Sequence, residues 1–154
     1  MIAPEIGTLT EALRERAYHI TIETAATVFK PVACDLASIS PKLANSTPRE
    51  EEGGKYAGRH EALRTNIEVI QAFIDAFPYQ LKFVIDTPGD LEELEKLLTR
   101  LNHIDRTRVL LMPQSITAEE LTEKSHWIAE LCKTHGFRYG SRLHLDLYGN
   151  TRGT

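Results

Sequence analysis

Polar residues that could bind a ligand follow three segments with the composition of β-strands. Glu23 and Thr24 end the first segment, residues 38–42 follow the second, and Pro113 and Gln114 follow a later one. Their carboxylate, hydroxyl, ammonium and amide groups suit hydrogen bonding to a polar ligand. Because ligands of parallel α/β folds gather at the carboxyl ends of strands, the pattern predicts a polar ligand rim.

The triplet Ser40-Pro41-Lys42 is the sharpest feature of this rim. Proline fixes the backbone where the strand ends, and the lysine then presents three hydrogen-bond donors to an anionic or polar group. Taken one at a time, these residues fit strand-end caps or exposed surface side chains better than ligand contacts. The binding hypothesis therefore depends on the three strand ends together.

The sequence shows no motif of a reactive centre. The six histidines include neither an HExxH motif nor an i, i+4 pair, so no metal site is predicted. No GxSxG, Walker or GxGxxG motif occurs, and no helix is predicted after the glycine-containing turn at residues 149–153. Cys34 and Cys132 are too few for a thiolate metal site and are interpreted as buried free thiols. We assign no catalytic and no metal-ligating residue.

The composition is that of an ordinary globular protein. Of the 154 residues, 42% are hydrophobic and 26% are charged, and the net charge is −4 with acids and bases interspersed. No nucleic-acid partner is predicted, because that would require a clustered basic face. No apolar run approaches the roughly 20 residues that span a bilayer, and no signal peptide is recognised. The sequence therefore predicts no membrane partner and a cytoplasmic location.

Hydrophobic periodicity predicts short strands that alternate with longer helices. Strands are predicted at residues 18–23, 32–38, 81–85, 108–112 and 142–148, and helices at 8–16, 57–76, 87–101 and 117–135. Strands joined by crossover helices imply a parallel sheet, so the fold class is α/β and residues 1–154 form one domain. The continuously apolar residues 109–112 suit a sheet covered on both faces, or the wall of a barrel.

Capping signals set several helix boundaries. Thr8, Thr87 and Thr117 are expected N-caps, each with an acidic residue three positions later, and Gly136 is expected to end the last helix. The polar residues 43–56 form a connection longer than most in compact domains. This connection is either a lid or a disordered insertion.

Five short motifs occur in a recognisable order along the chain. They are HITIET at residues 19–24, DLASISPK at 35–42, LKFV at 81–84, LLMP at 110–113 and LHLDLYGNTRGT at 143–154. Together they resemble the 7-carboxy-7-deazaguanine synthase family, which are radical S-adenosylmethionine (SAM) enzymes of the queuosine and deazapurine pathway. No single motif decides the resemblance, but five in the correct order make it specific.

The resemblance implies a fold, a reaction and partners. The fold would be part of a partial (β/α) barrel of the radical SAM kind, in a homodimer or associated with an N-terminal part. The family's reaction contracts the ring of a small-molecule pterin, 6-carboxy-5,6,7,8-tetrahydropterin, to 7-carboxy-7-deazaguanine with loss of ammonia. The family's cofactors are SAM, a [4Fe-4S] cluster and Mg²⁺.

The resemblance also assigns binding roles to residues of this chain. The cofactor SAM would contact Ala26, Ser40, Pro41, Lys42, Met112, Pro113, Gln114 and Ser115. The pterin substrate would contact Thr24, Asn150, Arg152 and Thr154.

Two departures from the family pattern affect these roles. The family has a glycine where this chain has Ala26, and the added methyl group could crowd SAM, because glycine permits close approach. The family's N-terminal segment, with three cluster cysteines, a magnesium-binding threonine and a glycine-rich substrate loop, has no counterpart in these 154 residues. We therefore expect a truncated C-terminal portion that lacks the cluster and Mg²⁺ ligands and is inactive alone.

Two alternatives stay open at this point. One is a degenerate, non-enzymatic α/β domain that keeps the fold and binds a nucleoside-like ligand or a partner chain. The other is an unrelated α/β binding module whose motif matches are chance. A CxxxCxxC-bearing segment upstream would exclude the first, and affinity for SAM would exclude the second.

Overall fold

The computed structural model describes residues 4–47, 58, 61, 64–149 and 151. The chain forms two compact units, one made of Met1–Lys42 and Thr47–Leu81 and the other of Leu43–Ser46 and Lys82–Thr154. We call them the first and the second unit. The assignment of residues 1–154 to one domain stays a prediction.

Five strands form one sheet in the order β1-β2-β3-β4-β5. They are β1 (Thr21–Thr24), β2 (Leu36–Ile39), β3 (Tyr79–Ile85), β4 (Val109–Pro113) and β5 (Arg138–Tyr139). The pairs β1–β2, β2–β3 and β4–β5 are parallel. Parallel neighbours need crossover connections, which helices supply here. The predicted α/β class with a parallel sheet and crossover helices is therefore confirmed.

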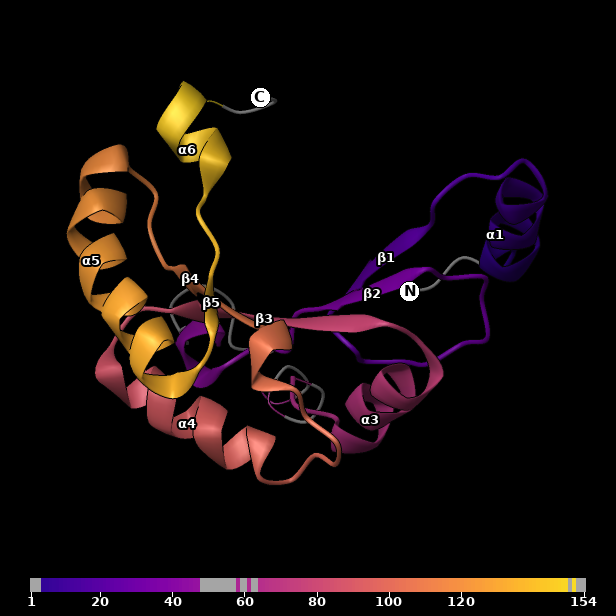
Figure 1. The fold of residues 1–154 in the computed structure, drawn as a ribbon, viewed down its shortest axis with the longest axis horizontal. Coiled ribbons are helices and arrows are strands. Elements are labelled where there is room, and N and C mark those ends of the chain that lie inside the picture. The colour runs from indigo at the N-terminus through magenta and orange to yellow at the C-terminus, as the bar shows by residue number, and fades with distance from the viewer. Residues whose placement is uncertain (1–3, 48–57, 59–60, 62–63, 150, 152–154) are drawn as a thin grey trace. The chain divides into compact units, whose positions relative to one another are not determined.

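The first unit contains β1, β2, α1 (Ile6–Glu15) and α3 (Ile67–Ala76) (Figure 1). Helix α1 is tied to the segment before β2, because the buried Thr10 hydroxyl accepts the amide of Ala33 at 3.1 Å. Helix α3 packs on β2 and buries Ile70 and Phe73. The Phe73 ring meets Phe29 edge-on with centroids 4.9 Å apart, which joins the connection after β1 to the same core.

The second unit contains β4, β5, α4 (Pro88–Leu98), α5 (Ala118–His135) and α6 (Leu143–Tyr148), with 3-10 turns at Ala44–Ser46 and Arg106–Arg108 (Figure 1). Helix α5 packs on β4 and β5 and buries Leu121, Ile128 and Cys132. The turn at Ala44–Ser46 is ordered, because Asn45 donates to the Val84 carbonyl at 2.9 Å. This turn is the first part of the connection predicted at residues 43–56, and residues 48–56 lie outside the described residues.

Each of the longer strands buries one side and leaves the other partly exposed. In β3 the residues Tyr79, Leu81, Phe83 and Ile85 are buried, and Gln80, Lys82 and Val84 between them are half-buried. Strand β4 alternates in the same way. Of the two alternatives for residues 109–112, a sheet covered on both faces is therefore wrong for the described chain.

The predicted caps hold at two of three helices. Asp90 accepts the amides of Asp86 and Thr87, both at 2.8 Å, and closes a capping box at the start of α4. Thr117 accepts the Glu120 amide at 3.2 Å, and Gly136 adopts the left-handed conformation (φ 72°) that ends α5. The predicted cap at Thr8 is wrong. Helix α1 begins at Ile6, and Glu5 precedes it without a side-chain cap.

Two predicted elements differ from the structure. The helix predicted at 57–76 begins at Ile67 among the described residues, because Asn66 caps it by accepting the Val69 amide. The strand predicted at 142–148 is the short helix α6, and the last strand is β5. Alternating leucines suggested a strand, but only Leu145 is buried, whereas Leu143 and Leu147 are 62% and 61% exposed. Short apolar runs do not distinguish the two periods.

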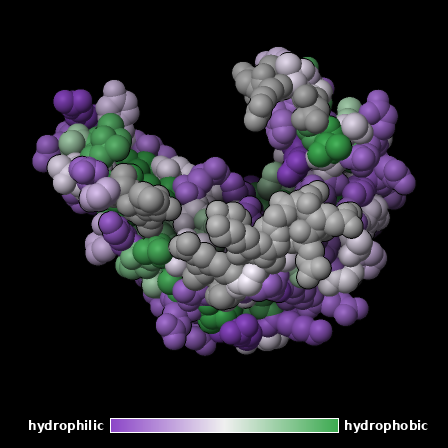
Figure 2. All heavy atoms as spheres, turned by 180° about the vertical axis from the view of Figure 1, so that it is seen from behind, coloured by the Kyte–Doolittle hydropathy of each residue, from purple (hydrophilic) through white to green (hydrophobic). Residues whose placement is uncertain are grey.

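Large apolar side chains are exposed in both units. They include Leu9, Tyr18 and Val28 in the first unit and Ile116, Leu143, Leu147 and Tyr148 in the second. Figure 2 shows apolar side chains in separate groups among hydrophilic ones, a distribution common on globular proteins. Among the described residues, no helix is long and apolar enough to cross a membrane.

Arg106 is expected to stabilise the second unit. Its guanidinium donates to the His135 carbonyl at 2.7 Å, makes two hydrogen bonds to Glu95, and lies 4.3 Å from the centre of the Phe137 ring. Arg106→Met should lower the free energy of unfolding by about 2 kcal/mol, a value that allows for the partial exposure of the pair. Denaturant titration followed by the fluorescence of Trp127, the single tryptophan, measures it. Arg108→Met is the matched control, since Arg108 pairs with exposed Asp105 and should cost under about 0.5 kcal/mol.

The same contacts predict a pH dependence. Hydrogen bonds from Arg106 hold the pKa of Glu95 below its ordinary value, partial burial opposes this, and His135 adds to the lowering. A lowered carboxyl pKa stabilises the fold above the ordinary value and loses that stabilisation as the pH falls through the lowered one. Stability should therefore decline below about pH 4.3, and Arg106→Met should flatten that decline. An unchanged acid limb in Arg106→Met would contradict this account.

Candidate functional site

The ends of β1 and β2 bring together two residues that the sequence assigned to ligand binding. The Ser40 amide donates to the Thr24 carbonyl at 2.7 Å, so the two strand ends are neighbours. The Thr24 hydroxyl accepts the Ala26 amide at 3.0 Å, which folds the chain back directly after the strand. Polar groups from two strands therefore meet at one edge of the first unit, as the sequence predicted.

The Ser40-Pro41-Lys42 turn is fixed by a residue that the sequence did not indicate. The Lys42 amide donates to the Arg64 carbonyl at 3.1 Å, and the Arg64 guanidinium donates back to the Lys42 carbonyl at 3.3 Å. Pro41 is buried and Lys42 is half-buried. The backbone of Lys42 is thus held from both sides, which leaves its ammonium group as the variable part of the turn.

Ala26 has a backbone conformation that explains a glycine in the family. Its φ is 53°, in the left-handed region, and it is fully buried. A residue with a Cβ atom pays about 1–2 kcal/mol in this region, whereas glycine does not. The sequence suggested close approach to a cofactor as the reason for glycine, and the backbone supplies a second, independent reason.

A row of polar side chains crosses the three strands of the first unit. Glu23, Ser38 and Gln80 are in register on β1, β2 and β3. Gln80 donates to the Ser38 hydroxyl at 2.9 Å, and that hydroxyl lies 3.5 Å from a carboxylate oxygen of Glu23. Because Ser38 is buried, this row orders the polar side of the sheet.

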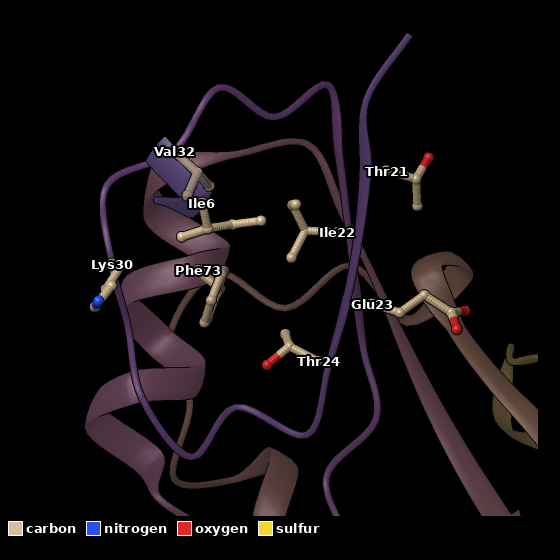
Figure 3. Close-up of a pocket in the computed structure, with 8 residues that line it drawn as sticks. All are labelled: Ile6, Thr21, Ile22, Glu23, Thr24, Lys30, Val32 and Phe73. Carbon is tan, nitrogen blue, oxygen red and sulfur yellow. The ribbon is translucent and has the colours of Figure 1, made fainter. Parts of the chain in front are cut away.

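A cavity of about 260 Å³ lies in the first unit beside β1. In Figure 3, Ile22 and Thr24 point toward Ile6 and Phe73, whereas Glu23 points away from them. The cavity is therefore mainly apolar, and Thr24 contributes a hydroxyl to it. Contact between Thr24 and a pterin stays a prediction.

The remaining assigned residues lie in the second unit or outside the described chain. Met112 and Pro113 end β4, and the Gln114 amide continues the pairing by donating to the Ile85 carbonyl at 2.8 Å. Ser115 is buried, and its hydroxyl has no hydrogen-bond partner among the described residues. Asn150, Arg152 and Thr154 lie outside the described residues. The roles assigned to all these residues stay predictions.

The described residues do not fit a metal or an iron–sulfur cluster. They contain no group of three or more His, Cys, Asp or Glu side chains that could hold a metal ion. Cys34 and Cys132 are free and buried, as predicted, and burial raises the pKa of both thiols. A raised pKa disfavours the thiolate that a metal or cluster requires.

These features define a parallel α/β fold with polar groups at the carboxyl ends of its strands. The crystal structure of QueE from Escherichia coli has the same fold, with a TM-score of 0.58 and 19% identity, over 89% of this chain and 50% of that one. The predicted fold class, an α/β fold of the radical SAM kind, is confirmed. No protein-family model matches the sequence.

Sequence relatives narrow this class. A 7-carboxy-7-deazaguanine synthase of Halobacterium salinarum is 39% identical over 95% of this chain, and one of Rhodopirellula baltica is 37% identical over 100% of it. The chain spans 60% of the length of each of these two relatives. Its resemblance to the 7-carboxy-7-deazaguanine synthase family, predicted from five motifs, is therefore confirmed over nearly its whole length.

Proposed function

We propose that the chain is the C-terminal portion of a 7-carboxy-7-deazaguanine synthase, in which it supplies strand ends that contact SAM and the pterin substrate. The observation that carries the proposal is the identity of 37–39% with two enzymes of that name over 95–100% of the chain. The neighbouring strand ends at Thr24 and Ser40 support it, because they place predicted substrate and cofactor contacts side by side.

The proposed reaction is the SAM-dependent radical ring contraction of 6-carboxy-5,6,7,8-tetrahydropterin to 7-carboxy-7-deazaguanine. When bound, SAM and a [4Fe-4S] cluster would supply the radical, and Mg²⁺ would assist. Ser40, Lys42 and Ser115 offer hydroxyl and ammonium donors that fit the polar groups of SAM. The cluster and Mg²⁺ need ligands that the described residues do not provide, so we propose that the chain is inactive without a cluster-binding N-terminal part.

The proposed partners follow from the same division. The chain would work as a homodimer or in association with the N-terminal part, and its small-molecule partner would be the pterin. The cytoplasmic location indicated by the sequence stays a prediction.

Titration with SAM tests the proposal. We expect a dissociation constant no better than about 0.1–1 mM, because the bond from the cluster to SAM is missing. Lys42→Ala should weaken binding by about 1–2 kcal/mol, roughly 5- to 30-fold, if its ammonium makes a charge-assisted hydrogen bond to SAM. NMR of isotope-labelled chain would follow the amides of residues 39–43 and 112–115.

Lys30→Ala is the matched control for this titration. Lys30 is half-buried in the same unit but lines the apolar cavity rather than the Ser40-Pro41-Lys42 turn. It should leave the dissociation constant within about twofold. Equal effects of the two substitutions, or no response of either amide group to SAM, would contradict the assignment of the turn to SAM.

A further inference from the structure

The segment after β4 has nearly all of its backbone polar groups engaged by other parts of the second unit. The Gln114 amide donates to the Ile85 carbonyl at 2.8 Å, and the Ile116 amide donates to the Glu120 carboxylate at 2.9 Å. These bonds extend the β3–β4 pairing and tie the segment to the first turn of α5. Residues 114–116 are therefore held although they form no regular element.

Lys124 holds the same segment from α5. Its ammonium donates to the Gln114 carbonyl at 2.9 Å and forms a hydrogen-bonded ion pair with Asp86, which follows β3. One side chain thus joins α5 to the ends of both β3 and β4. The Lys124 side chain is only 25% exposed, and partial burial strengthens such charge-assisted contacts.

Arg142 holds the next carbonyl. Its guanidinium donates to the Ser115 carbonyl at 2.8 Å from the position just before α6. Two cations, 18 positions apart in the sequence by their residue numbers, therefore bind consecutive carbonyls of one short segment. Carbonyls fixed in this way are not available to a ligand.

The Ser115 hydroxyl is the exception in this segment. The residue is 2% exposed, and its oxygen has no hydrogen-bond partner within the described part of the chain. A buried hydroxyl without a partner costs about 1–3 kcal/mol, so such a group in a pinned segment needs an explanation. A ligand that completes its hydrogen bonding supplies one.

We infer that Lys124 and Arg142 are positioning residues, which hold the Gln114 and Ser115 carbonyls so that the Ser115 hydroxyl is the group presented to the ligand. The identity of this ligand as SAM rests on the proposed function. The arrangement provides preorganisation, because the backbone is fixed before the ligand arrives and little ordering is left for binding to pay. It also explains why two cations far from each other in sequence converge on one segment.

The test uses the full chain and SAM as the probe. Lys124→Met and Arg142→Met should each weaken SAM binding by about fivefold or more and enlarge the hydrogen-exchange rates of the Gln114 and Ile116 amides. Lys124→Arg should restore part of the affinity, because it keeps the cation. Lys133→Met is the matched control, since Lys133 lies on α5 but pairs with Glu130 on the exposed side, and it should change neither quantity.

Ser115→Ala separates a ligand-binding role from a structural one. Removal of a buried hydroxyl without a partner should leave the melting temperature unchanged or raise it, yet weaken SAM binding by about three- to tenfold. A structural serine would show the reverse, with a lower melting temperature and unchanged affinity.

The outcomes distinguish this inference from the proposed function. If about 5 mM SAM shifts no amide of the unaltered chain, the proposed function fails and this inference fails with it. If the unaltered chain binds SAM, but Lys124→Met, Arg142→Met and Ser115→Ala all bind it equally well, only this inference is overturned.

Discussion

Anaerobic reconstitution of this chain with iron and sulfide is expected to leave it without a [4Fe-4S] cluster. Such clusters are held by cysteine thiolates, and the chain has only Cys34 and Cys132. Both thiols are buried, and burial raises the pKa of each, which opposes thiolate formation. Iron and sulfide analysis, together with the absorbance near about 400 nm, measures the result.

Two controls make this result decisive. The double substitution Cys34→Ser and Cys132→Ser should not change the iron content, because neither thiol is expected to bind iron. The Halobacterium salinarum relative, treated in the same way, shows whether the procedure loads a cluster. A brown chain with about four iron atoms, reduced by the double substitution, would contradict the account.

Ala26→Val is expected to destabilise the first unit by about 3 kcal/mol. Ala26 is fully buried with φ at 53°, and a β-branched residue is a strong outlier in this region of backbone space. The two added methyl groups must also enter a packed core, which commonly costs about 1–3 kcal/mol. Denaturant titration followed by circular dichroism would measure the loss.

The neighbouring alanine supplies the control. Ala25 is half-buried and has no positive φ, so Ala25→Val should change stability by less than about 1 kcal/mol. Ala26→Gly should stay within about 1 kcal/mol of the unaltered chain, because relief of backbone strain offsets the lost methyl burial and the added chain entropy. Equal losses for Ala25→Val and Ala26→Val would show that backbone conformation is not the cause.

The fold could be predicted from local patterns where those patterns were strong. The threonine–acid spacing at Thr87 and Thr117 located two helix starts, and Gly136 located a helix end, because caps act through neighbouring residues. The segment at 142–148 failed, because alternating leucines in a short run also fit a helix whose single buried residue is Leu145. Packing, not propensity, decided that element.

The candidate site was predictable only in part. The strand-end position of Thr24 and Ser40 followed from the rule for parallel sheets, and their hydrogen bond confirms that the two ends are neighbours. Arg64, Lys124 and Arg142 had no sequence signal, because each acts on a carbonyl at least 10 positions away, through contacts that only the folded chain creates. The positive φ of Ala26 was hidden for a different reason, since alanine carries no conformational signal.

The most direct test of the proposed function restores the missing part. The N-terminal 40% or so of the Halobacterium salinarum relative, which this chain does not match, would be coexpressed with the chain and purified anaerobically. The mixture would be given SAM, Mg²⁺, a reductant and 6-carboxy-5,6,7,8-tetrahydropterin. The account predicts a complex that holds iron and forms 7-carboxy-7-deazaguanine, while each part alone forms none. A complex that holds a cluster and cleaves SAM but forms no product, when the intact relative does, would contradict it.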